Sequence, residues 1–150
     1  MPNTPVKVGE GMVLYTATDN VSPAALDEFL TIMARGGRFD RLDEKLIDAG
    51  CAVSGCGPAF AYMFIEALAD GAVTCGLPRS KAIAYAAQTL LGSAKMVLET
   101  GDHPELLKDN VCSPGGSTIA GVRELEEHGF RGAALDAVIA AYDKTVELGK

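Results

Sequence analysis

The feature that most constrains this chain is a helical periodicity running from residue 22 to residue 147. Apolar residues recur every three or four positions, which places them on one face of an α-helix. The first segment opens with Ser22-Pro23, an N-cap followed by proline at the first helical position, and stops at Gly36-Gly37. The pattern therefore predicts an all-α bundle of about six helices. The later helices are expected over residues 43–53, 58–75, 79–99, 105–110, 119–128 and 131–147.

Residues 1–20 follow a different pattern. The run at 1–5 contains too much proline for a helix. Val6, Val8 and the segment 12–15 flank Gly9-Glu10-Gly11, which is typical of a β-hairpin with a glycine turn. Because a lone hairpin is marginally stable, we interpret it as the edge of a sheet whose other strands are outside this sequence; a hairpin packed on a helical domain is the alternative. The predicted boundary separates a strand segment, 1–20, from a helical domain, 21–150.

Composition and charge exclude several classes of partner. The 150 residues are about one domain, 48% are hydrophobic and the net charge is −7. A chain this acidic does not neutralise the phosphates of a nucleic acid, so we expect no nucleic-acid partner. No uninterrupted apolar run reaches the roughly 18 residues of a membrane span, and the N-terminus lacks a signal-peptide pattern. We therefore expect no membrane partner and a cytosolic location.

The longest predicted helices carry an unusual amount of alanine and glycine. Segments 58–75 and 79–99 have more apolar or small surface than a single packed side needs, and the first is expected to be buried. Small residues let helices approach closely, and surplus apolar surface in a soluble chain is commonly covered by another subunit. We predict a homodimer with interdigitated helices; a self-contained monomeric bundle is the alternative.

A glycine-rich loop precedes the helix expected at 119–128. It reads Lys-Asp-Asn-Val-Cys-Ser-Pro-Gly-Gly-Ser-Thr over residues 108–118. Two glycines allow a ligand close to the backbone, and the free N–H groups at a helix start favour a small anion. The loop is therefore interpreted as a carboxylate or phosphate cradle. The alternative is a tight turn in which Ser117 or Thr118 only caps the helix.

The four cysteines do not form a metal or disulfide pattern. Cys51, Cys56, Cys75 and Cys112 are 5, 19 and 37 residues apart, with no Cys-x-x-Cys. We expect most of them to be buried small side chains and predict no metal site. A catalytic thiol at Cys56, and hence a cysteine-dependent hydrolase, is a minor alternative because such a thiol needs a nearby base.

Short motifs along almost the whole chain resemble one enzyme family. The sequence looks like the C-terminal part of pyrroline-5-carboxylate reductase, which reduces a cyclic imine to proline with a nicotinamide cofactor. No single motif suffices, but together they are highly specific. The matching runs are Met-Pro-Asn-Thr-Pro at 1–5, Val-Gly-Glu-Gly at 8–11, Leu-Ile-Asp-Ala at 46–49, Gly-Pro-Ala-Phe at 57–60, Ala-Leu-Ala-Asp-Gly at 67–71, Gly-Leu-Pro-Arg at 76–79, Lys-Asp-Asn-Val at 108–111 and Ser-Pro-Gly-Gly-Ser-Thr-Ile at 113–119.

The resemblance also identifies a part that these residues lack. Members of the family begin with a Rossmann domain whose glycine-rich turn holds the cofactor pyrophosphate, and residues 1–150 contain no Gly-x-Gly-x-x-Gly. By this likeness the predicted hairpin is the last piece of that sheet. The cofactor, NADPH or NADH, would be bound mainly by the absent domain, and a separately supplied Rossmann domain is a candidate partner. A non-catalytic dimerisation module lacking the cofactor domain is the alternative function.

The same resemblance assigns a substrate site. The substrate would be 1-pyrroline-5-carboxylate and the product L-proline. Ser113, Gly116, Ser117 and Thr118 would bind the substrate carboxylate through hydroxyl and backbone groups. Thr118 would also hydrogen-bond the imine nitrogen, which makes it the predicted catalytic residue.

Three further residues would lie near the cofactor by the same likeness. Asn110 and Glu44 are expected beside the nicotinamide ribose, and Asn3 near the junction with the Rossmann domain. The alternatives are a C-capping amide for Asn110 and a helix-start carboxylate for Glu44. Cys56 and Cys112 depart from the family pattern, which often has serine at both positions.

Overall fold

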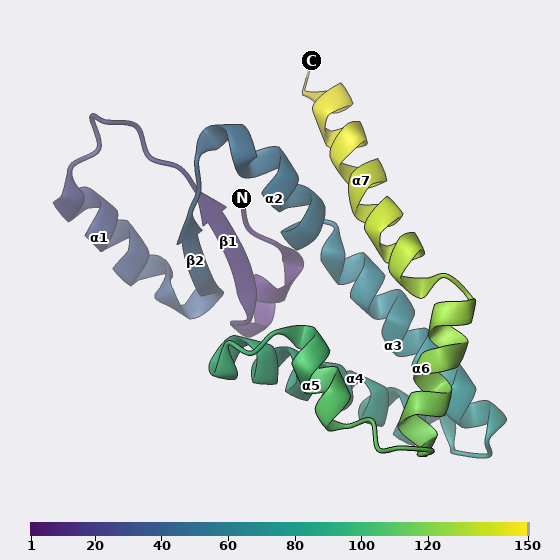
Figure 1. Cartoon of the computed structure of the whole chain (residues 1–150). Coiled ribbons are helices and arrows are strands. Elements are labelled where there is room, and N and C mark those ends of the chain that lie inside the picture. Colours follow the sequence, from purple (N-terminus) through teal and green to yellow (C-terminus); the bar gives the residue numbers. More distant parts are fainter. Residues whose placement is uncertain (150) are drawn as a thin grey trace. The chain divides into compact units, whose positions relative to one another are not determined.

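The computed structural model describes residues 1–149, which form two compact units. Unit 1 consists of Met1–Phe60 and the described residues from Ala134 onward, and unit 2 is Ala61–Ala133. Most of the chain is helical, as predicted, with a small sheet near the N-terminus (Figure 1). The elements in chain order are the 3-10 helix η1 (Thr4–Val8), β1 (Gly11–Tyr15), α1 (Pro23–Met33), η2 (Ala34–Gly36), β2 (Gly37–Arg41), η3 (Glu44–Leu46), α2 (Ile47–Ser54), α3 (Gly57–Thr74), α4 (Arg79–Thr100), α5 (Pro104–Asn110), α6 (Ser117–Glu127) and α7 (Phe130–Leu148).

The two strands are parallel, so the predicted hairpin is wrong. Strands β1 and β2 pair from Gly11 opposite Gly37 to Tyr15 opposite Arg41, and α1 connects them. Residues 4–8 are not a strand but the 3-10 helix η1, which Gly9 ends with a positive φ of 77°. Pro5 is compatible with this helix because proline is tolerated in a first turn. The small sheet is confirmed, although its second strand is supplied from beyond residue 20, and the domain boundary at residue 20 stays a prediction.

Gly11, which was interpreted as a turn residue, and Gly37, which was interpreted as part of a helix stop, permit close backbone approach. A Cβ atom on Gly37 would lie 2.2 Å from the carbonyl oxygen of Gly11, and Gly37 also has a φ of +124°. A Cβ on Gly11 would lie 2.2 Å from a side-chain carbon of Val6. Only glycine fits where two backbones and η1 meet this closely. The start of the β1–β2 pair therefore requires both residues.

Apolar contacts of unit 1 hold α1 and α2 against the sheet. The Phe29 ring of α1 lies edge-on between Tyr15 and Phe39, with ring centroids 6.4 and 6.1 Å away. On α2, Ala52 is fully buried, and a Cβ on Gly50 would come within 2.4 Å of the Leu14 side chain. These contacts give the β1–α1–β2 segment its core, and the aromatic edge-to-face geometry adds to the burial.

Unit 2 is built on a close contact between α3 and α4. Its buried core consists of Ala69, Ala82 and Ala86, with Ile65 and Leu77 packed beside them. Small side chains from both helices thus form this core. No large side chain is fully buried among residues 1–149. The single chain therefore has a thin core.

Much apolar surface stays exposed as a consequence. The prediction that segment 58–75 is buried is wrong for the chain by itself, because only Ala69 of α3 is buried. Tyr62 and Met63 of that helix are 59% and 69% exposed. The predicted apolar stripe of α7 is also exposed at Leu135 and Ile139. These side chains require a cover outside the single chain.

One stretch of helix has the length and composition of a membrane span. It covers residues 44–74 and is scarcely buried in the part of the chain that the structure describes. No membrane partner was predicted from the sequence, because no apolar run reaches the roughly 18 residues of a membrane span. Length and composition alone are weak evidence for a membrane span, since the core helices of soluble proteins share them.

The close approach of β1 and β2 leads to a stability prediction. Substituting Gly37→Ala is expected to lower the free energy of unfolding by about 1–3 kcal/mol, because alanine is strained at positive φ and its Cβ meets backbone. Urea denaturation measures the change. Gly36→Ala is the matched control, since a Cβ there meets only Phe39 ring atoms at 3.7 Å. Equal stability of the two variants would contradict the role assigned to Gly37.

Candidate functional site

The glycine-rich loop contains a type II β-turn over residues 113–116. The Gly116 N–H donates to the carbonyl of Ser113 at 3.0 Å, and Gly115 has a φ of +69°. A type II turn favours proline at its second position and requires a positive φ at its third. Pro114 and Gly115 satisfy both conditions. The run is therefore a tight turn, which leaves open whether it is also an anion cradle.

Gly116 is required for a second reason. A Cβ on this residue would lie 2.4 Å from Ser113 Oγ and 3.1 Å from the Ser113 carbonyl oxygen. The Ser113 hydroxyl therefore lies directly against the N-cap of α6. Any side chain at residue 116 would displace that hydroxyl.

The first turn of α6 is not capped by a side chain. Its N-cap residue is Gly116, in an extended conformation and with no side-chain cap hydrogen bond. Ser117 and Thr118 are the first two helical residues, so the alternative in which either caps this helix does not describe the structure. The amides of residues 117–119 have no intrahelical acceptor, because the first such bond is donated by Ala120 to Gly116. An anion would satisfy these amides and the positive end of the helix dipole.

The hydroxyl groups at this turn are available to a ligand. Ser113, Ser117 and Thr118 are exposed, and none forms a side-chain hydrogen bond within residues 1–149. Gly116 supplies the close backbone approach. These four residues lie within six consecutive positions, so the turn brings the predicted substrate-binding residues together.

Asn110 is the last residue of α5 and borders an open cavity of about 450 Å³ in unit 2. Its neighbours there include Val97, Leu107 and Lys108. The C-capping alternative is not seen, because the C-cap is Val111, whose own N–H donates to the carbonyl of Lys108 at 3.1 Å. Asn110 is exposed, and it precedes the turn at 113–116 by three residues in sequence. Its role toward a cofactor stays a prediction.

Glu44 and Asn3 belong to unit 1. Glu44 begins η3 and borders an open cavity of about 520 Å³ with Tyr15, Thr16 and Asp48. This cavity lies at the carboxyl end of β1, where open parallel sheets commonly bind their ligands. The cap of η3 is Asp43, whose carboxylate accepts the Lys45 N–H at 2.9 Å. Glu44 is therefore a helix-start carboxylate, as the alternative expected, although Asp43 is the cap. Its cofactor role stays a prediction.

Asn3 has a structural role that the sequence did not predict. Its Oδ1 accepts the N–H of Met12 at 2.9 Å, and its Nδ2 donates to the carbonyl of Ser54 at 2.9 Å. One side chain thus joins the start of β1 to the end of α2. These bonds use much of the amide's capacity, while its predicted place near the cofactor domain stays untested.

The bonds of Asn3 give a second stability prediction. Asn3→Ala removes both and is expected to lower the free energy of unfolding by about 1–3 kcal/mol, since two part-buried backbone groups lose their partner. Thermal or urea unfolding measures it. In the control Asn3→Asp, the acceptor for Met12 remains and the donor to Ser54 is lost, so a smaller loss is expected. An alanine variant as stable as the parent would contradict this role.

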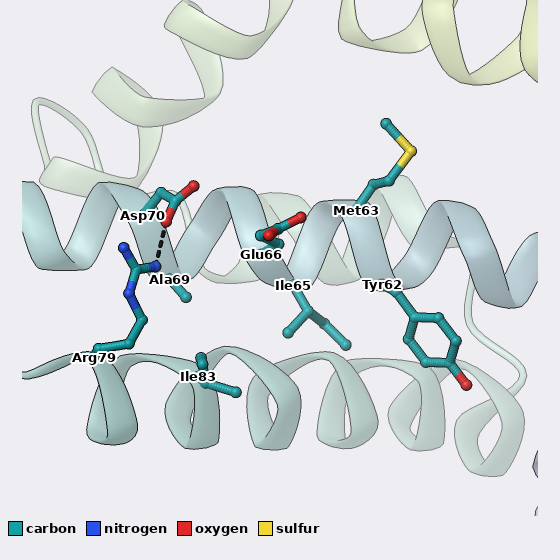
Figure 2. Close-up of a pocket in the computed structure, with 8 residues that line it drawn as sticks. All are labelled: Tyr62, Met63, Ile65, Glu66, Ala69, Asp70, Arg79 and Ile83. Atoms are coloured by element: carbon teal, nitrogen blue, oxygen red, sulfur yellow. Dashed lines mark hydrogen bonds and ion pairs between the residues drawn. The ribbon is translucent and has the colours of Figure 1, made fainter.

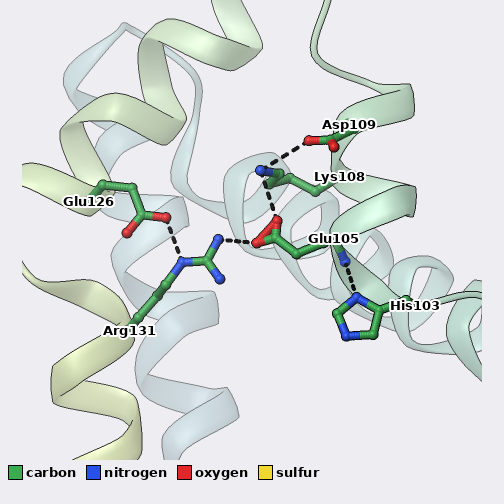
Figure 3. Close-up of polar contacts among 6 residues, drawn as sticks. All are labelled: His103, Glu105, Lys108, Asp109, Glu126 and Arg131. Carbon is green, nitrogen blue, oxygen red and sulfur yellow. Dashed lines mark hydrogen bonds and ion pairs between the residues drawn. The ribbon is translucent and has the colours of Figure 1, made fainter.

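A charge network in unit 2 was missed from the sequence (Figure 3). The Glu105 carboxylate accepts from Lys108 Nζ at 2.9 Å and from the Arg131 guanidinium. Arg131 also bonds Glu126 through Nε at 2.5 Å, and Lys108 reaches Asp109 at 3.1 Å. The spacing of Glu105 and Lys108 on one helix was readable. The contact with Arg131, which is 26 residues away, was not.

The network shifts the protonation equilibria of its members. Hydrogen bonds from Lys108 and then Arg131 lower the pKa of Glu105. The bond to Glu105, followed by that to Asp109, raises the pKa of Lys108. Glu105, Lys108 and Arg131 are therefore charged at neutral pH, and the attraction of Glu105 for its two cationic partners is lost when Glu105 takes up a proton, below its ordinary pKa.

The cysteines and histidines do not assemble a nucleophilic site in the described residues. The pKa of the Cys51 thiol is raised, first by partial burial and then by the neighbouring Cys56 and Asp48. His103 Nδ1 accepts the Glu105 N–H at 3.2 Å, and His128 Nδ1 lies 2.8 Å from the carbonyl of Glu124. Both histidines are thus engaged at helix ends. No group of three metal-binding side chains occurs within residues 1–149.

Apolar and charged side chains line one stretch of α3 and α4 (Figure 2). It borders a shallow cavity of about 520 Å³. Ile65 and Ala69 face α4, whereas Met63 points away from it. An ion pair between Asp70 and Arg79 joins the two helices at one end. This stretch combines exposed large side chains with a small-residue contact beneath them.

Comparison with known proteins decides the family. A family model for pyrroline-5-carboxylate reductase dimerisation matches residues 44–148. The pyrroline-5-carboxylate reductase of Escherichia coli (strain K12) is 49% identical over 150 residues, covering 100% of this chain and 56% of the relative. The chain belongs to the pyrroline-5-carboxylate reductase family. The resemblance predicted from the motifs is therefore confirmed.

Other relatives of this family agree in sequence and in fold. The Synechocystis reductase is 50% identical over 150 residues, covering 100% of this chain and 56% of that relative. The Plasmodium falciparum pyrroline carboxylate reductase structure with NADP bound has a TM-score of 0.91 at 39% identity, covering 100% of this chain and 62% of that one. The Coxiella burnetii reductase structure has a TM-score of 0.91 at 34% identity, covering 100% of this chain and 56% of that one. The chain thus spans about half the length of the curated relatives it matches.

Proposed function

We propose that this polypeptide supplies the substrate-binding and dimerisation part of a reductase that converts 1-pyrroline-5-carboxylate to L-proline. The observation that carries the proposal is the uncapped first turn of α6 directly after the type II turn. It offers free amides, hydroxyls and a positive dipole end to a small carboxylate. Membership of the family supports this choice of anion over a phosphate. The cytosolic location expected from the sequence is part of the same proposal.

In the proposed site each residue of the turn has a chemical role. The amides of Ser117 and Thr118 and the hydroxyls of Ser113 and Ser117 hold the substrate carboxylate. Gly116 keeps the backbone close enough for these contacts. The Thr118 hydroxyl hydrogen-bonds the imine nitrogen and orients the carbon beside it. Holding the substrate in this orientation lowers the entropic part of the activation free energy of hydride transfer.

The cofactor of the proposed reaction is NADPH or NADH, which supplies a hydride to the imine carbon. NADP is named in the related Plasmodium falciparum structure. In this chain Glu44 would reach the nicotinamide ribose from the cavity at the carboxyl end of β1, and Asn110 would approach it from the end of α5. The carboxylate and amide suit ribose hydroxyls, which donate and accept hydrogen bonds. Pyrophosphate binding falls to a Rossmann domain, because residues 1–150 contain no glycine-rich phosphate turn.

The proposed assembly is a homodimer or a larger homo-oligomer. The dimerisation match spans α2 to α7, and its helices carry the exposed apolar side chains. A second copy covering these side chains would supply the core that one chain lacks. We also assign the apolar stretch 44–74 to a protein contact. Other helices of the dimerisation match carry exposed apolar side chains too, and they do not have the composition of a membrane span.

A non-catalytic dimerisation module is the second candidate. It is favoured by one observation, namely that the matched family model describes dimerisation and the cofactor turn is not within these residues. Such a module would pair with intact subunits. The two candidates differ in whether these residues hold substrate.

An activity assay separates the candidates. We expect residues 1–150 alone to form no proline from pyrroline-5-carboxylate and NADPH, because hydride transfer lacks a cofactor cleft. Replacing the matched part of the Escherichia coli relative by these residues is expected to give an active chimera. Saturable turnover by the isolated chain would overturn the first expectation. A folded, NADPH-binding chimera without turnover would overturn the proposed function.

Thr118 provides the control within that chimera. Thr118→Ala is expected to lower kcat/KM about 10- to 100-fold, since it removes a hydrogen bond made by the reacting group. Thr118→Ser keeps the hydroxyl and should retain most activity. If the alanine variant is as active as the parent, Thr118 is not the group that orients the imine.

Association is tested on the exposed face of α3. Met63→Glu is expected to raise the dimer dissociation constant by at least about tenfold, because it places a charge where an apolar side chain would be buried. Analytical ultracentrifugation or light scattering at micromolar concentration gives the mass. Val8→Glu is the control, as Val8 is equally exposed but outside the dimerisation match. A monomeric parent chain would refute the dimer.

A further inference from the structure

Helix α5 carries the chain into the turn but has little apolar anchorage of its own. It is seven residues long and none of its residues is buried in the described chain. Leu106 is more than half exposed. A helix this short is not stable by itself. What holds its position also sets where the turn at 113–116 begins.

Among the ion pairs of the described residues, the one that joins α5 to another helix is made by Glu105. This residue lies in the first turn of α5, and Arg131 lies in the first turn of α7. The two side chains are joined directly, as Figure 3 shows. The turn and the whole of α6 lie between them in sequence. The ion pair therefore ties together the two ends of the segment that contains the proposed substrate site.

The Arg131 end of this tie is itself well fixed. Its guanidinium donates through Nε to Glu126 at 2.5 Å and through Nη2 to Glu105. The planar group thus bridges two carboxylates by different edges, which restricts its orientation. The neighbouring Phe130 packs against Phe64 of α3, with ring centroids 5.3 Å apart. Arg131 consequently connects α5 to a packed part of unit 2.

On the α5 side, Glu105 uses both oxygens. One accepts from Arg131, and the other accepts from Lys108 Nζ at 2.9 Å. Lys108 is two residues before Asn110 and five before Ser113. Its ammonium also contacts Asp109, so the last turn of α5 belongs to the same network. A displacement of Arg131 would therefore reach the start of the turn through a continuous set of contacts.

We propose that Arg131 and Glu105 form a clasp that positions the substrate turn. Both are positioning residues, because they act through α5 and touch no reacting atom. The inference rests on the proposed function in taking residues 113–118 as the substrate site. Without the clasp, α5 and the turn would sample more conformations, while every substrate-binding group would still be present. The expected result is weaker carboxylate binding with little change in the chemical step.

Hydrogen exchange tests the clasp without any substrate. In the full chain, Arg131→Met and Glu105→Gln are each expected to raise amide exchange over residues 106–118 by about fivefold, the effect of losing a modest local interaction. Arg131→Lys keeps the positive charge but loses the planar guanidinium that bonds two carboxylates. Its amide exchange should lie between that of the parent and that of Arg131→Met. Mass spectrometry of peptides from this segment gives the rates. Unchanged exchange in both variants would overturn the proposal.

Arg123→Met is the matched control. Arg123 is an exposed cation that also pairs with two carboxylates, Glu124 and Glu127, but both lie on its own helix. Its removal should leave exchange over 106–118 as in the parent. A rise as large as that of Arg131→Met would show a general loss of charge balance and would count against a clasp.

The kinetic readout distinguishes this inference from the proposed function. In the active chimera, Arg131→Met should raise KM for pyrroline-5-carboxylate several-fold while kcat changes less than about twofold, as for a loss of uniform binding. A lower kcat with unchanged KM would overturn the positioning role. If exchange rises but the parent chimera has no activity, the clasp stands and the proposed substrate does not. If amide exchange over α3 rises as well, the Arg131→Met variant is unfolded. The exchange of Glu105→Gln over residues 106–118 then tests the clasp.

Discussion

The type II turn at residues 113–116 is the constraint on which the proposed site depends. Pro114 and Gly115 set the turn, and the Ser113 hydroxyl leaves no room for a side chain at Gly116. The chain then enters α6 with a glycine at the N-cap, so no side chain occupies the first amides. A capping side chain at the N-cap would occupy these amides, and the close Ser113 hydroxyl disfavours one at residue 116. Local stability is thus lower where a ligand is expected to bind.

The exposed helical surface gives the rest of the chain its character. Alanine allows α3 and α4 to approach closely, but it contributes little burial to the core. The large apolar side chains instead point outward, and the family match assigns this region to dimerisation. In the proposed assembly, folding and association would be coupled, since a second copy would supply the surface that completes the core.

Several features were predictable because they depend on local interactions. Helix starts at Ser22-Pro23 and Pro104, and stops at Gly101, follow from proline and glycine chemistry within a few residues. The five helices predicted from residue 58 onward agree with the structure to within about two residues, the usual uncertainty of helix ends. The first predicted helix ends earlier, at Met33, and the one expected from residue 43 begins as the 3-10 helix η3, with α2 starting only at Ile47. The turn at 113–116 was also readable from its residues. Each of these depends on neighbours in the sequence.

Other features depended on partners distant in sequence. Gly11 was interpreted as a turn glycine, but a Cβ atom there would meet Val6 and the carbonyl oxygen of Gly36, because α1 returns the chain as a parallel strand. Asn3 was assigned to a cofactor, yet it bonds Met12 and Ser54. No local pattern distinguishes a hairpin glycine from one at a close approach, because the pattern does not contain the other backbone.

The sequence by itself determined the family, the helical architecture and the residues of the turn, because motifs and periodicity are local or additive signals. Only the tertiary structure decided the parallel strand pairing, the exposure of α3 and the contact between Glu105 and Arg131. Each of these joins residues whose separation in sequence carries no information about their distance in space. Loop closure and packing bring them together, and those depend on the whole chain at once.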